Sequence, residues 1–246
     1  MADIRIHNKS EDLIQSAAEL FLKTGTAAQQ REGIFSVVLS GGSTPLPLYQ
    51  LLADSADSSP LDWHKTHFFW GDERPVGPDH PDSNYGGANQ ALLAPLAIPP
   101  ENIHRIQGER QPEIAARYYE EALARFFGER PPRFDLIFLG LGDDGHTASL
   151  FPGRIPLGST TTDQDRLVQA VQVPAIGSAR ITFSAALINA AALVVFLVAG
   201  QDKASALRSV IHGPYQPETF PAQLIRPGNG GLIWLVDRDA AAKLDS

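Results

Sequence analysis

The sequence predicts an α/β fold of the Rossmann-like type, with a mostly parallel sheet covered by helices on both faces. Its apolar residues gather in short runs, and segments with helical periodicity separate several of these runs. Continuous apolar runs are typical of strands buried on both faces, and alternation of strands with helices is typical of parallel sheets. The expected strands span residues 34–39, 67–70, 134–141, 193–199 and 232–236.

Two segments show the apolar periodicity of amphipathic helices. The first helix is expected to begin after Ser10, a favourable N-cap residue that is followed by two acidic residues in the first turn. The second is expected to run from about Pro112 and to end at Gly128, because glycine readily adopts the conformation that terminates a helix. The residues expected on the buried faces are Ala17, Leu20 and Phe21 in the first helix and Ala115, Tyr118, Ala122 and Phe126 in the second.

Composition and charge limit the class of protein and the partners. Of the 246 residues, 43% are hydrophobic and 20% are charged, and no low-complexity linker divides the chain, so one domain over residues 1–246 is expected. The net charge of −8 argues against nucleic acid or an anionic membrane as the main partner, because both require basic surfaces. The chain has no cysteine, which excludes disulfides and a cysteine nucleophile.

The first residues predict no secretory signal. Charges are spread through residues 1–15, and no uninterrupted apolar stretch approaches the length of about 20 residues that a membrane-spanning helix needs. A cytoplasmic protein is therefore expected. No metal site is expected either, since His64 and His67 lack an evident third ligand.

Three loops of unusual composition follow three of the expected strands. Their sequences are SGGSTP at residues 40–45, GDERP at residues 71–75 and GDDGHT at residues 142–147. Ligand sites in open parallel sheets collect where the carboxyl ends of the strands meet. These loops are therefore expected to form one site.

The loop at residues 40–45 has the features of an anion-binding turn. Its glycines allow close approach of a ligand to the backbone, Ser43 or Thr44 can cap the helix that follows, and Pro45 suits the first turn of that helix. Free N–H groups at the start of a helix favour a phosphate. An ordinary tight turn with a good N-cap explains the same pattern, so the pattern alone leaves both interpretations open.

The loop at residues 71–75 carries Asp72, Glu73 and Arg74 directly after an apolar strand. At the edge of a sheet these charges are suited to recognise substrate hydroxyls and to stabilise developing negative charge. The alternative is a solvated turn with surface salt bridges, each worth about 0–1 kcal/mol. The Pro-rich connection that follows is expected to form part of a wall or lid.

The loop at residues 142–147 is the most informative. A buried strand delivers Asp143, Asp144 and His146 at its carboxyl end. Histidine is the side chain best suited to accept a proton near neutral pH, and a neighbouring carboxylate fixes its tautomer. His146 is therefore the candidate general base, whereas the histidines without such a setting are expected on the surface or in packing.

Positive charge is expected from two further residues. Arg180 opens the segment at residues 180–184, and Lys203 follows the strand at residues 193–199 at the start of a helix. A lysine in this position is suited to bind a phosphate, although solvated surface is the alternative. Arg226 is a weaker candidate, because no spacing argument places it near the others.

Five segments of the chain occur in the order that one known family shows. They are LSGGSTP at residues 39–45, WGDERPV at 70–76 with DSNYG at 82–86, GLGDDGHTASLFPG at 140–153, RITFSAALINAA at 180–191 and FLVAGQDKA at 196–204. By these segments the chain resembles the 6-phosphogluconolactonase family, which is related in fold to the glucosamine-6-phosphate deaminases. The segments span most of the chain from the first core strand onward, and the three loop motifs in this order form a specific signal.

The resemblance implies an α/β fold of the glucosamine-6-phosphate deaminase and ribose-phosphate isomerase type. It also implies hydrolysis of 6-phospho-D-glucono-1,5-lactone in the oxidative pentose phosphate pathway, with no metal and no cofactor. The residues that it implies are His146 as general base, Arg74 near the reacting carbonyl, Asp72 and Asp144 as acidic residues lining the site, and Gly42, Ser43, Thr44, Arg180 and Lys203 around the phosphate. Phe183 stands where many relatives have leucine, a conservative departure.

Two other functions stay open on the sequence. Glucosamine-6-phosphate deaminases share the fold and the Asp-Gly-His loop, but they carry a further acidic residue shortly after the histidine, and residues 147–151 contain none. Non-catalytic sugar-phosphate sensors usually carry a DNA-binding module, and the chain shows no helix-turn-helix or basic stretch. The expected partner is a small phosphorylated sugar lactone, with neither nucleic acid nor membrane, bound by a monomer or weak homodimer.

Overall fold

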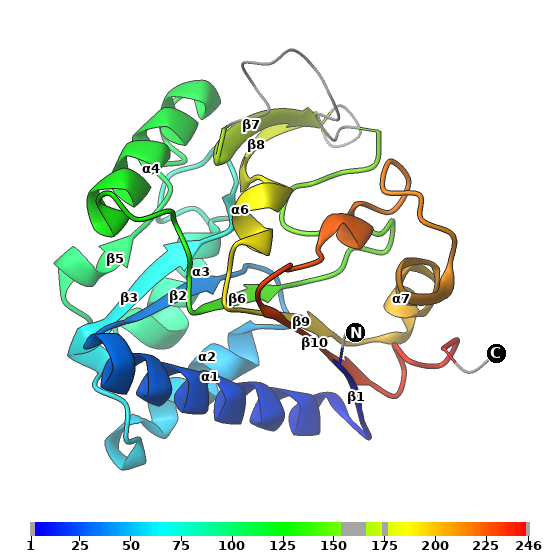
Figure 1. Cartoon of the computed structure of the whole chain (residues 1–246), viewed down its shortest axis with the longest axis horizontal. Helices are drawn as coiled ribbons and strands as arrows, with labels where there is room; N and C mark the ends of the chain where they lie inside the picture. Colours follow the sequence, from blue (N-terminus) through cyan, green and yellow to red (C-terminus); the bar gives the residue numbers. More distant parts are fainter. Residues whose placement is uncertain (1–2, 154–165, 174–176, 245–246) are drawn as a thin grey trace.

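A seven-stranded sheet forms the centre of the protein in the computed structural model, which describes residues 3–153, 166–173 and 177–244. The strand order is β1-β10-β9-β6-β2-β3-β5, and neighbouring strands are parallel (Figure 1). The strands are β1 (Asp3–His7), β2 (Phe35–Leu39), β3 (Thr66–Trp70), β5 (Ile103–His104), β6 (Leu136–Leu139), β9 (Leu193–Val198) and β10 (Gly231–Asp237). The parallel sheet predicted from the apolar runs is confirmed.

A second sheet of three strands has the order β4-β8-β7. Its strands are β4 (Asp72–Glu73), β7 (Val168–Val173) and β8 (Ser178–Phe183), and both pairs are antiparallel. The apolar pattern does not predict this sheet, because β4 is too short to show any periodicity. The sheet matters for the site, since β4 and β8 carry Asp72 and Arg180.

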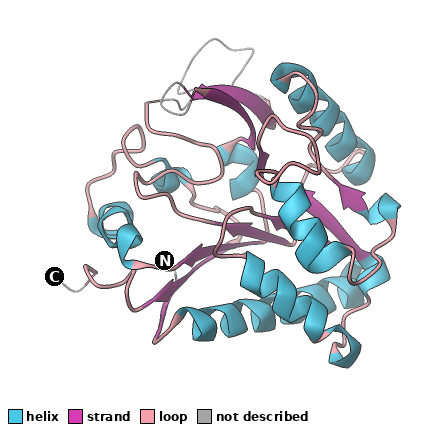
Figure 2. Cartoon of the chain, turned by 180° about the vertical axis from the view of Figure 1, so that it is seen from behind, coloured by secondary structure: helices cyan, strands magenta, loops and turns pink. Residues whose placement is uncertain are grey.

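Helices cover both faces of the central sheet, as predicted. Helix α1 contacts β1, β2 and β10 on one face (Figures 1 and 2). On the opposite side, α4 packs against β7 and β8 of the second sheet, and its Phe126 contacts Phe69 of β3 in the central sheet. The helices are α1 (Ser10–Glu32), α2 (Leu46–Asp54), α3 (Asn84–Ala88), α4 (Pro112–Phe127), α6 (Ala185–Asn189) and α7 (Ala204–His212). Within the described residues, no helix has the length and apolar character needed to cross a membrane.

Two details of the predicted helices are wrong. Lys9, rather than Ser10, occupies the N-cap position of α1, and no side chain caps this helix. In α4, Tyr118 is 44% exposed, and its neighbour Tyr119 is buried instead. Tyr119 suits the buried position because its hydroxyl accepts the backbone N–H of Trp70 at 2.9 Å, which satisfies the polar end of the ring.

The carboxyl ends of β2 and β6 define the place where a ligand can reach the backbone. The strands β3 and β5 lie on one side of β2, and β6, β9 and β10 lie on the other. The loops that leave β2 and β6 therefore diverge, and they open a crevice at this edge of the sheet. At the opposite end of the pair, Asp135 Oδ2 accepts hydrogen bonds from Ser36 N at 2.9 Å and from Ser36 Oγ at 2.8 Å.

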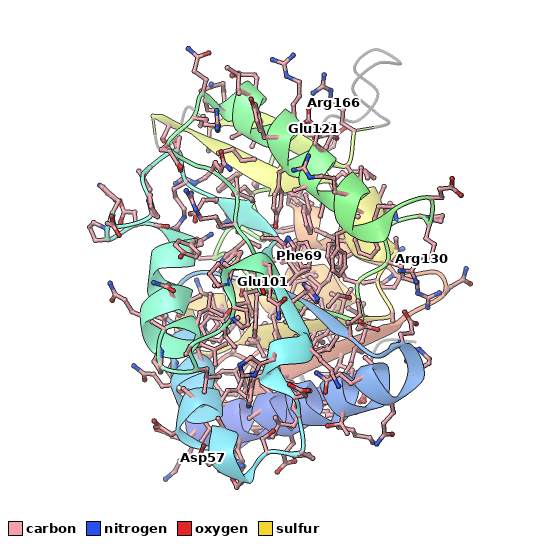
Figure 3. All side chains as sticks on the ribbon, turned by 90° about the vertical axis from the view of Figure 1, so that its left-hand side faces the viewer. Asp57, Phe69, Glu101, Glu121, Arg130 and Arg166 are labelled. Atoms are coloured by element: carbon pink, nitrogen blue, oxygen red, sulfur yellow. The ribbon has the colours of Figure 1, made fainter. Side chains whose placement is uncertain are left out.

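A half-buried pair of histidines joins β3 to the edge strand β5. Nδ1 of His67 and Nε2 of His104 are 3.1 Å apart, and the ring of His104 stacks on Phe69 with centroids 4.3 Å apart. Figure 3 labels Phe69 among the side chains packed between the central sheet and α4. Burial lowers the pKa of His67, which Glu101 partly counteracts, and burial together with His67 lowers the pKa of His104 to about 4.

We predict that the free energy of unfolding falls as the pH drops from 7 to 5. An unfolded histidine binds a proton near pH 6.5, whereas folded His104 resists protonation down to about pH 4, so the unfolded chain takes up this proton first. Because solvent reaches part of the ring, the loss is about 1–2 kcal/mol. Urea unfolding of the wild type and of His104→Phe at pH 7, 6 and 5 measures it. The free energy of unfolding of the variant should fall less, since phenylalanine keeps the stack on Phe69 without ionising. An equal fall in the wild type and the variant would contradict the explanation.

Candidate active site

A cavity of about 250 Å³ lies at the carboxyl ends of β2, β3, β6 and β9. Its walls come from the loops that follow these strands, as expected for an open parallel sheet. Of the residues predicted for the site, the lining includes Gly42, Ser43, Thr44, Asp72, Arg74, His146 and Lys203. Asp144 and Arg180 are not among the lining residues, although Asp144 contacts His146, which lines the cavity. The structure thus brings the three unusual loops together.

His146 and Asp144 form a close pair at this cavity. Nδ1 of His146 lies 2.6 Å from Oδ1 of Asp144, which also accepts the backbone N–H of His146 at 2.9 Å. A Cβ atom at Gly142 would lie 2.1 Å from the same Nδ1, so only glycine leaves room for the ring in this position. With the proton of Nδ1 donated to Asp144, the lone pair of the imidazole is on Nε2.

The glycine-rich loop after β2 turns tightly along one side of the cavity. Gly42 has a φ of 96°, in the region that favours glycine. The start of the loop is fixed by Tyr49, whose hydroxyl accepts the N–H of Ser40 at 3.0 Å and donates to its carbonyl at 2.7 Å. Burial raises the pKa of Tyr49, so the phenol stays protonated and keeps both bonds.

The prediction that Ser43 or Thr44 caps α2 is wrong. Pro45 occupies the N-cap position, and no side chain makes a capping hydrogen bond. Pro45 already has helical backbone angles (φ −81°, ψ −16°), so the two hydroxyls lie before the position from which a cap reaches the first turn. They line the cavity instead.

The three charged residues after β3 have different environments. Asp72 and Arg74 line the cavity, whereas Glu73 is 1% exposed and turns away from it. The Glu73 carboxylate accepts the backbone N–H groups of Arg74 at 2.8 Å, Asn84 at 2.8 Å and Tyr85 at 2.9 Å. Burial raises the pKa of Glu73, and these donors counteract it. Glu73 therefore holds the following loop against β4, which corrects the expectation that it faces a substrate.

The cationic candidates differ in how close they lie to the cavity. Lys203 lines it, and its Nζ pairs with Asp202 at 3.0 Å. Arg180 lies in β8, which pairs with β4 directly before Arg74, and burial and then repulsion from Arg74 lower the pKa of Arg180. The structure does not bring Arg226 to this site. Its guanidinium lies 4.2 Å from the centre of the Tyr215 ring, and it lines a different cavity.

The sequence pattern did not predict the roles of two polar residues at the site, Asn84 and Ser149. Asn84 lines the cavity, and its Nδ2 donates to the carbonyl oxygen of Asp72 at 3.0 Å and to Oδ1 of Asp72 at 3.2 Å. Buried Ser149 donates its hydroxyl to Oδ2 of Asp72 at 2.6 Å. Both residues stand inside the family-like segments, but a single sequence does not show which hydroxyl or amide contacts a carboxylate.

The site combines three chemical capabilities around one small cavity. A histidine with a fixed tautomer is suited to activate a water, and a guanidinium is suited to stabilise an oxyanion. The glycine-rich turn and a lysine are suited to hold an anionic group. In the described part of the chain, no three His, Asp or Glu side chains gather as metal ligands.

Comparison with known proteins gives a consistent family. The model of the family described as glucosamine-6-phosphate isomerases/6-phosphogluconolactonase matches residues 8–234. A 6-phosphogluconolactonase of Synechocystis sp. is 45% identical over 236 residues, which are 94% of this chain and 94% of the relative. The structure of 6-phosphogluconolactonase from Trypanosoma cruzi has a TM-score of 0.84 at 27% identity, covering 100% of this chain and 98% of that chain. A monomeric glucosamine-6-phosphate deaminase has a TM-score of 0.81 at 21% identity, covering 98% and 99%, and shares the fold.

The match includes every segment that contributes to the cavity, from the loop after β2 to Lys203. The resemblance predicted from the loop motifs is confirmed, and so is the α/β fold of the deaminase type. The chain belongs to the glucosamine-6-phosphate isomerase/6-phosphogluconolactonase family.

Proposed function

We propose that this chain hydrolyses 6-phospho-D-glucono-1,5-lactone to 6-phosphogluconate, as a carboxylic ester hydrolase of the oxidative pentose phosphate pathway. The observation that carries the proposal is the His146–Asp144 pair, with 2.6 Å between Nδ1 and Oδ1, at a cavity that Lys203 and the glycine-rich loop also line. Relatives at 45% and 42% identity bear the name 6-phosphogluconolactonase, which points to the same reaction.

In this proposal His146 acts as a general base through Nε2. It takes a proton from a water while the water oxygen attacks C1, and the carbonyl oxygen becomes an oxyanion. Asp144 stabilises the imidazolium that forms. Collapse of the tetrahedral intermediate breaks the bond between C1 and the ring oxygen, and that oxygen leaves as the C5 hydroxyl after receiving the proton from His146. General base catalysis of this kind contributes about 10²–10⁴-fold in rate.

Arg74 is proposed to stabilise the oxyanion. Its guanidinium lines the cavity and is anchored by a hydrogen bond to the carbonyl oxygen of Asp82. The guanidinium carries five N–H donors, so this anchor leaves others for a ligand. A well-placed oxyanion donor contributes about 10²–10³-fold in rate.

The phosphate is proposed to bind between the glycine-rich loop and Lys203. Gly42, Ser43 and Thr44 offer backbone N–H groups and hydroxyls there, and Lys203 is the N-cap residue of α7, where the helix dipole is positive. Arg180 adds a further positive charge beside Arg74. Binding of this remote group orients the lactone over His146, which lowers the entropic part of the barrier.

A deaminase activity has less support than lactone hydrolysis. Deaminases of the family use an acidic residue shortly after the histidine for ring opening, and residues 147–151 contain none. Phe151 occupies this region instead, with its ring centre 4.4 Å from that of His146. An apolar ring beside the imidazole does not supply the acid that deamination requires.

The proposal includes the setting of the reaction. We propose one domain over residues 1–246 that acts in the cytoplasm as a monomer or weak homodimer, without metal or cofactor. The net charge of −8 supports a small molecule, rather than nucleic acid or an anionic membrane, as the partner.

The first prediction from the proposed function concerns His146. His146→Ala should lower kcat about 10²–10⁴-fold, because the general base is removed. A coupled assay with freshly generated 6-phosphogluconolactone, corrected for spontaneous ring opening, measures the change. His212→Ala, at the exposed end of α7, serves as the control and should keep wild-type turnover. Wild-type turnover in the His146 variant would rule out the base assignment.

The second prediction concerns the tautomer of His146. Asp144→Asn should lower kcat at least about 100-fold, because a neutral amide does not stabilise the imidazolium and, where its NH₂ group faces Nδ1, places the imidazole proton on Nε2. The matched control is Asp143→Asn, which removes an adjacent exposed carboxylate. If the two variants have the same kcat in the lactonase assay, the Asp144 carboxylate does not orient the base.

The third prediction separates binding from chemistry. Lys203→Ala should raise KM about tenfold and change kcat much less, because the lysine contacts a group remote from the reacting carbonyl. Lys65→Ala, in which an exposed lysine before β3 is removed, controls for the change in net charge. A fall in kcat at unchanged KM would place Lys203 at the reacting carbonyl instead.

A further inference from the structure

We propose that Ser149 is a positioning residue, which together with Asn84 fixes the Asp72 carboxylate so that it accepts hydrogen bonds from the ring hydroxyls of the substrate. This inference rests on the proposed function and adds to it the residues that recognise the sugar. It starts from a network of three side chains that come from three separate loops and meet beside the cavity.

Both oxygens of Asp72 are held by protein donors. Oδ2 accepts the hydroxyl of Ser149 at 2.6 Å, and Oδ1 accepts Nδ2 of Asn84 at 3.2 Å. Ser149 is 2% exposed and Asn84 is 5% exposed, so water does not compete for these bonds. The carboxylate is therefore held in one orientation rather than in several rotamers.

The remaining acceptor capacity of Asp72 is available to the cavity. A carboxylate has about four lone-pair positions, and Ser149 and Asn84 use two of them. Nδ2 of Asn84 is itself saturated, because it also donates to the carbonyl oxygen of Asp72 at 3.0 Å. Asp72 lines the cavity, so the unused positions are suited to accept hydrogen bonds from substrate hydroxyls.

Asp72 does not orient Arg74 through an ion pair. Among the described residues the two side chains form no salt bridge, and the guanidinium donates to the carbonyl oxygen of Asp82 instead. The neighbours that fix Asp72 are Ser149 and Asn84. Asp72 therefore acts on the ligand directly, which separates its role from that of Arg74.

Ser149 connects Asp72 to the loop that carries His146. It follows His146 by three residues, and its N–H donates to Oγ1 of Thr182 at 3.1 Å. The intervening Ala148 has a φ of 47°, an unfavourable value for a residue with a side chain, and it lines the cavity. The strained turn is held in place by these contacts of Ser149, so the hydroxyl fixes Asp72 relative to His146.

A double-mutant cycle tests the inference. We expect Ser149→Ala to lower kcat/KM about tenfold, mainly through KM, because ground-state recognition of the hydroxyls is weakened. Asp72→Ala should lower kcat/KM about 100-fold. The double variant should have a kcat/KM no more than about twofold below that of Asp72→Ala, because the carboxylate that Ser149 positions is already absent.

The matched control is Thr147→Val. It removes a buried hydroxyl of the same loop, which donates to the carbonyl oxygen of Gly140 at 2.9 Å and does not contact Asp72. Thr147→Val should lower kcat/KM by the same factor in the wild type and in the Asp72→Ala background. This should hold even if the melting temperature of the Thr147→Val variant falls as much as that of Ser149→Ala. This separates loss of loop stability from loss of Asp72 orientation.

The outcomes of this cycle are distinct. If the losses in kcat/KM caused by Ser149→Ala and by Asp72→Ala multiply in the double variant, Ser149 does not act through Asp72, and the positioning role is overturned. Turnover by the wild type would still support the proposed function. Unchanged kcat/KM in Ser149→Ala would overturn the positioning role as well. Absence of lactonase turnover in the wild type would overturn the proposed function and, with it, this inference.

Discussion

The pairing of β2 with β6 at the centre of the sheet is the constraint on which the rest of the site depends. Val37 and Val38 align with Leu136 and Ile137, and Asp135 locks this register from the amino end through its hydrogen bonds to Ser36. A slip of one residue would move the loop after β6 by about 3.3 Å relative to the glycine-rich loop. The register set at one end of the pair therefore fixes the distance between the histidine and the glycine-rich loop at the other end.

Buried side chains that bind backbone hold the loops of the site in place. Tyr49 binds both backbone groups of Ser40, Glu73 binds the N–H groups of the loop after β4, and Tyr119 binds the end of β3. Loops normally contribute the mobile part of a protein, and a catalytic arrangement loses rate when its groups are misplaced by about 1 Å. These bonds set the shape of the cavity before a ligand arrives, so little ordering is left to occur on binding.

The sequence predicted the central sheet and the location of the site better than the details of either. Apolar runs identify β2, β3, β6, β9 and β10 because burial on both faces leaves a continuous pattern, and the carboxyl ends of such strands share one edge. The small sheet was missed because β4 has only two residues, so its pairing with β8 depends on tertiary contacts. The role of Glu73 was predicted wrongly and that of Ser149 was not predicted, for a related reason. Residues distant in sequence decide whether a polar side chain faces a ligand or the backbone.

The positive charges of the site lie close together within a chain whose net charge is −8. Burial and the nearby Arg74 lower the pKa of Arg180, which means that this setting disfavours its cationic form, and Asp72, Asp82 and Glu73 offset only part of that effect. Asp72 is already bound to Ser149 and Asn84, so it is not free to turn towards Arg180. The oxyanion that forms beside Arg74 in the proposed reaction would relieve the repulsion between the two guanidinium groups. The charges around Arg74 and Arg180 therefore favour negative charge at this place in the proposed reaction, in addition to any direct hydrogen bond from the guanidinium groups.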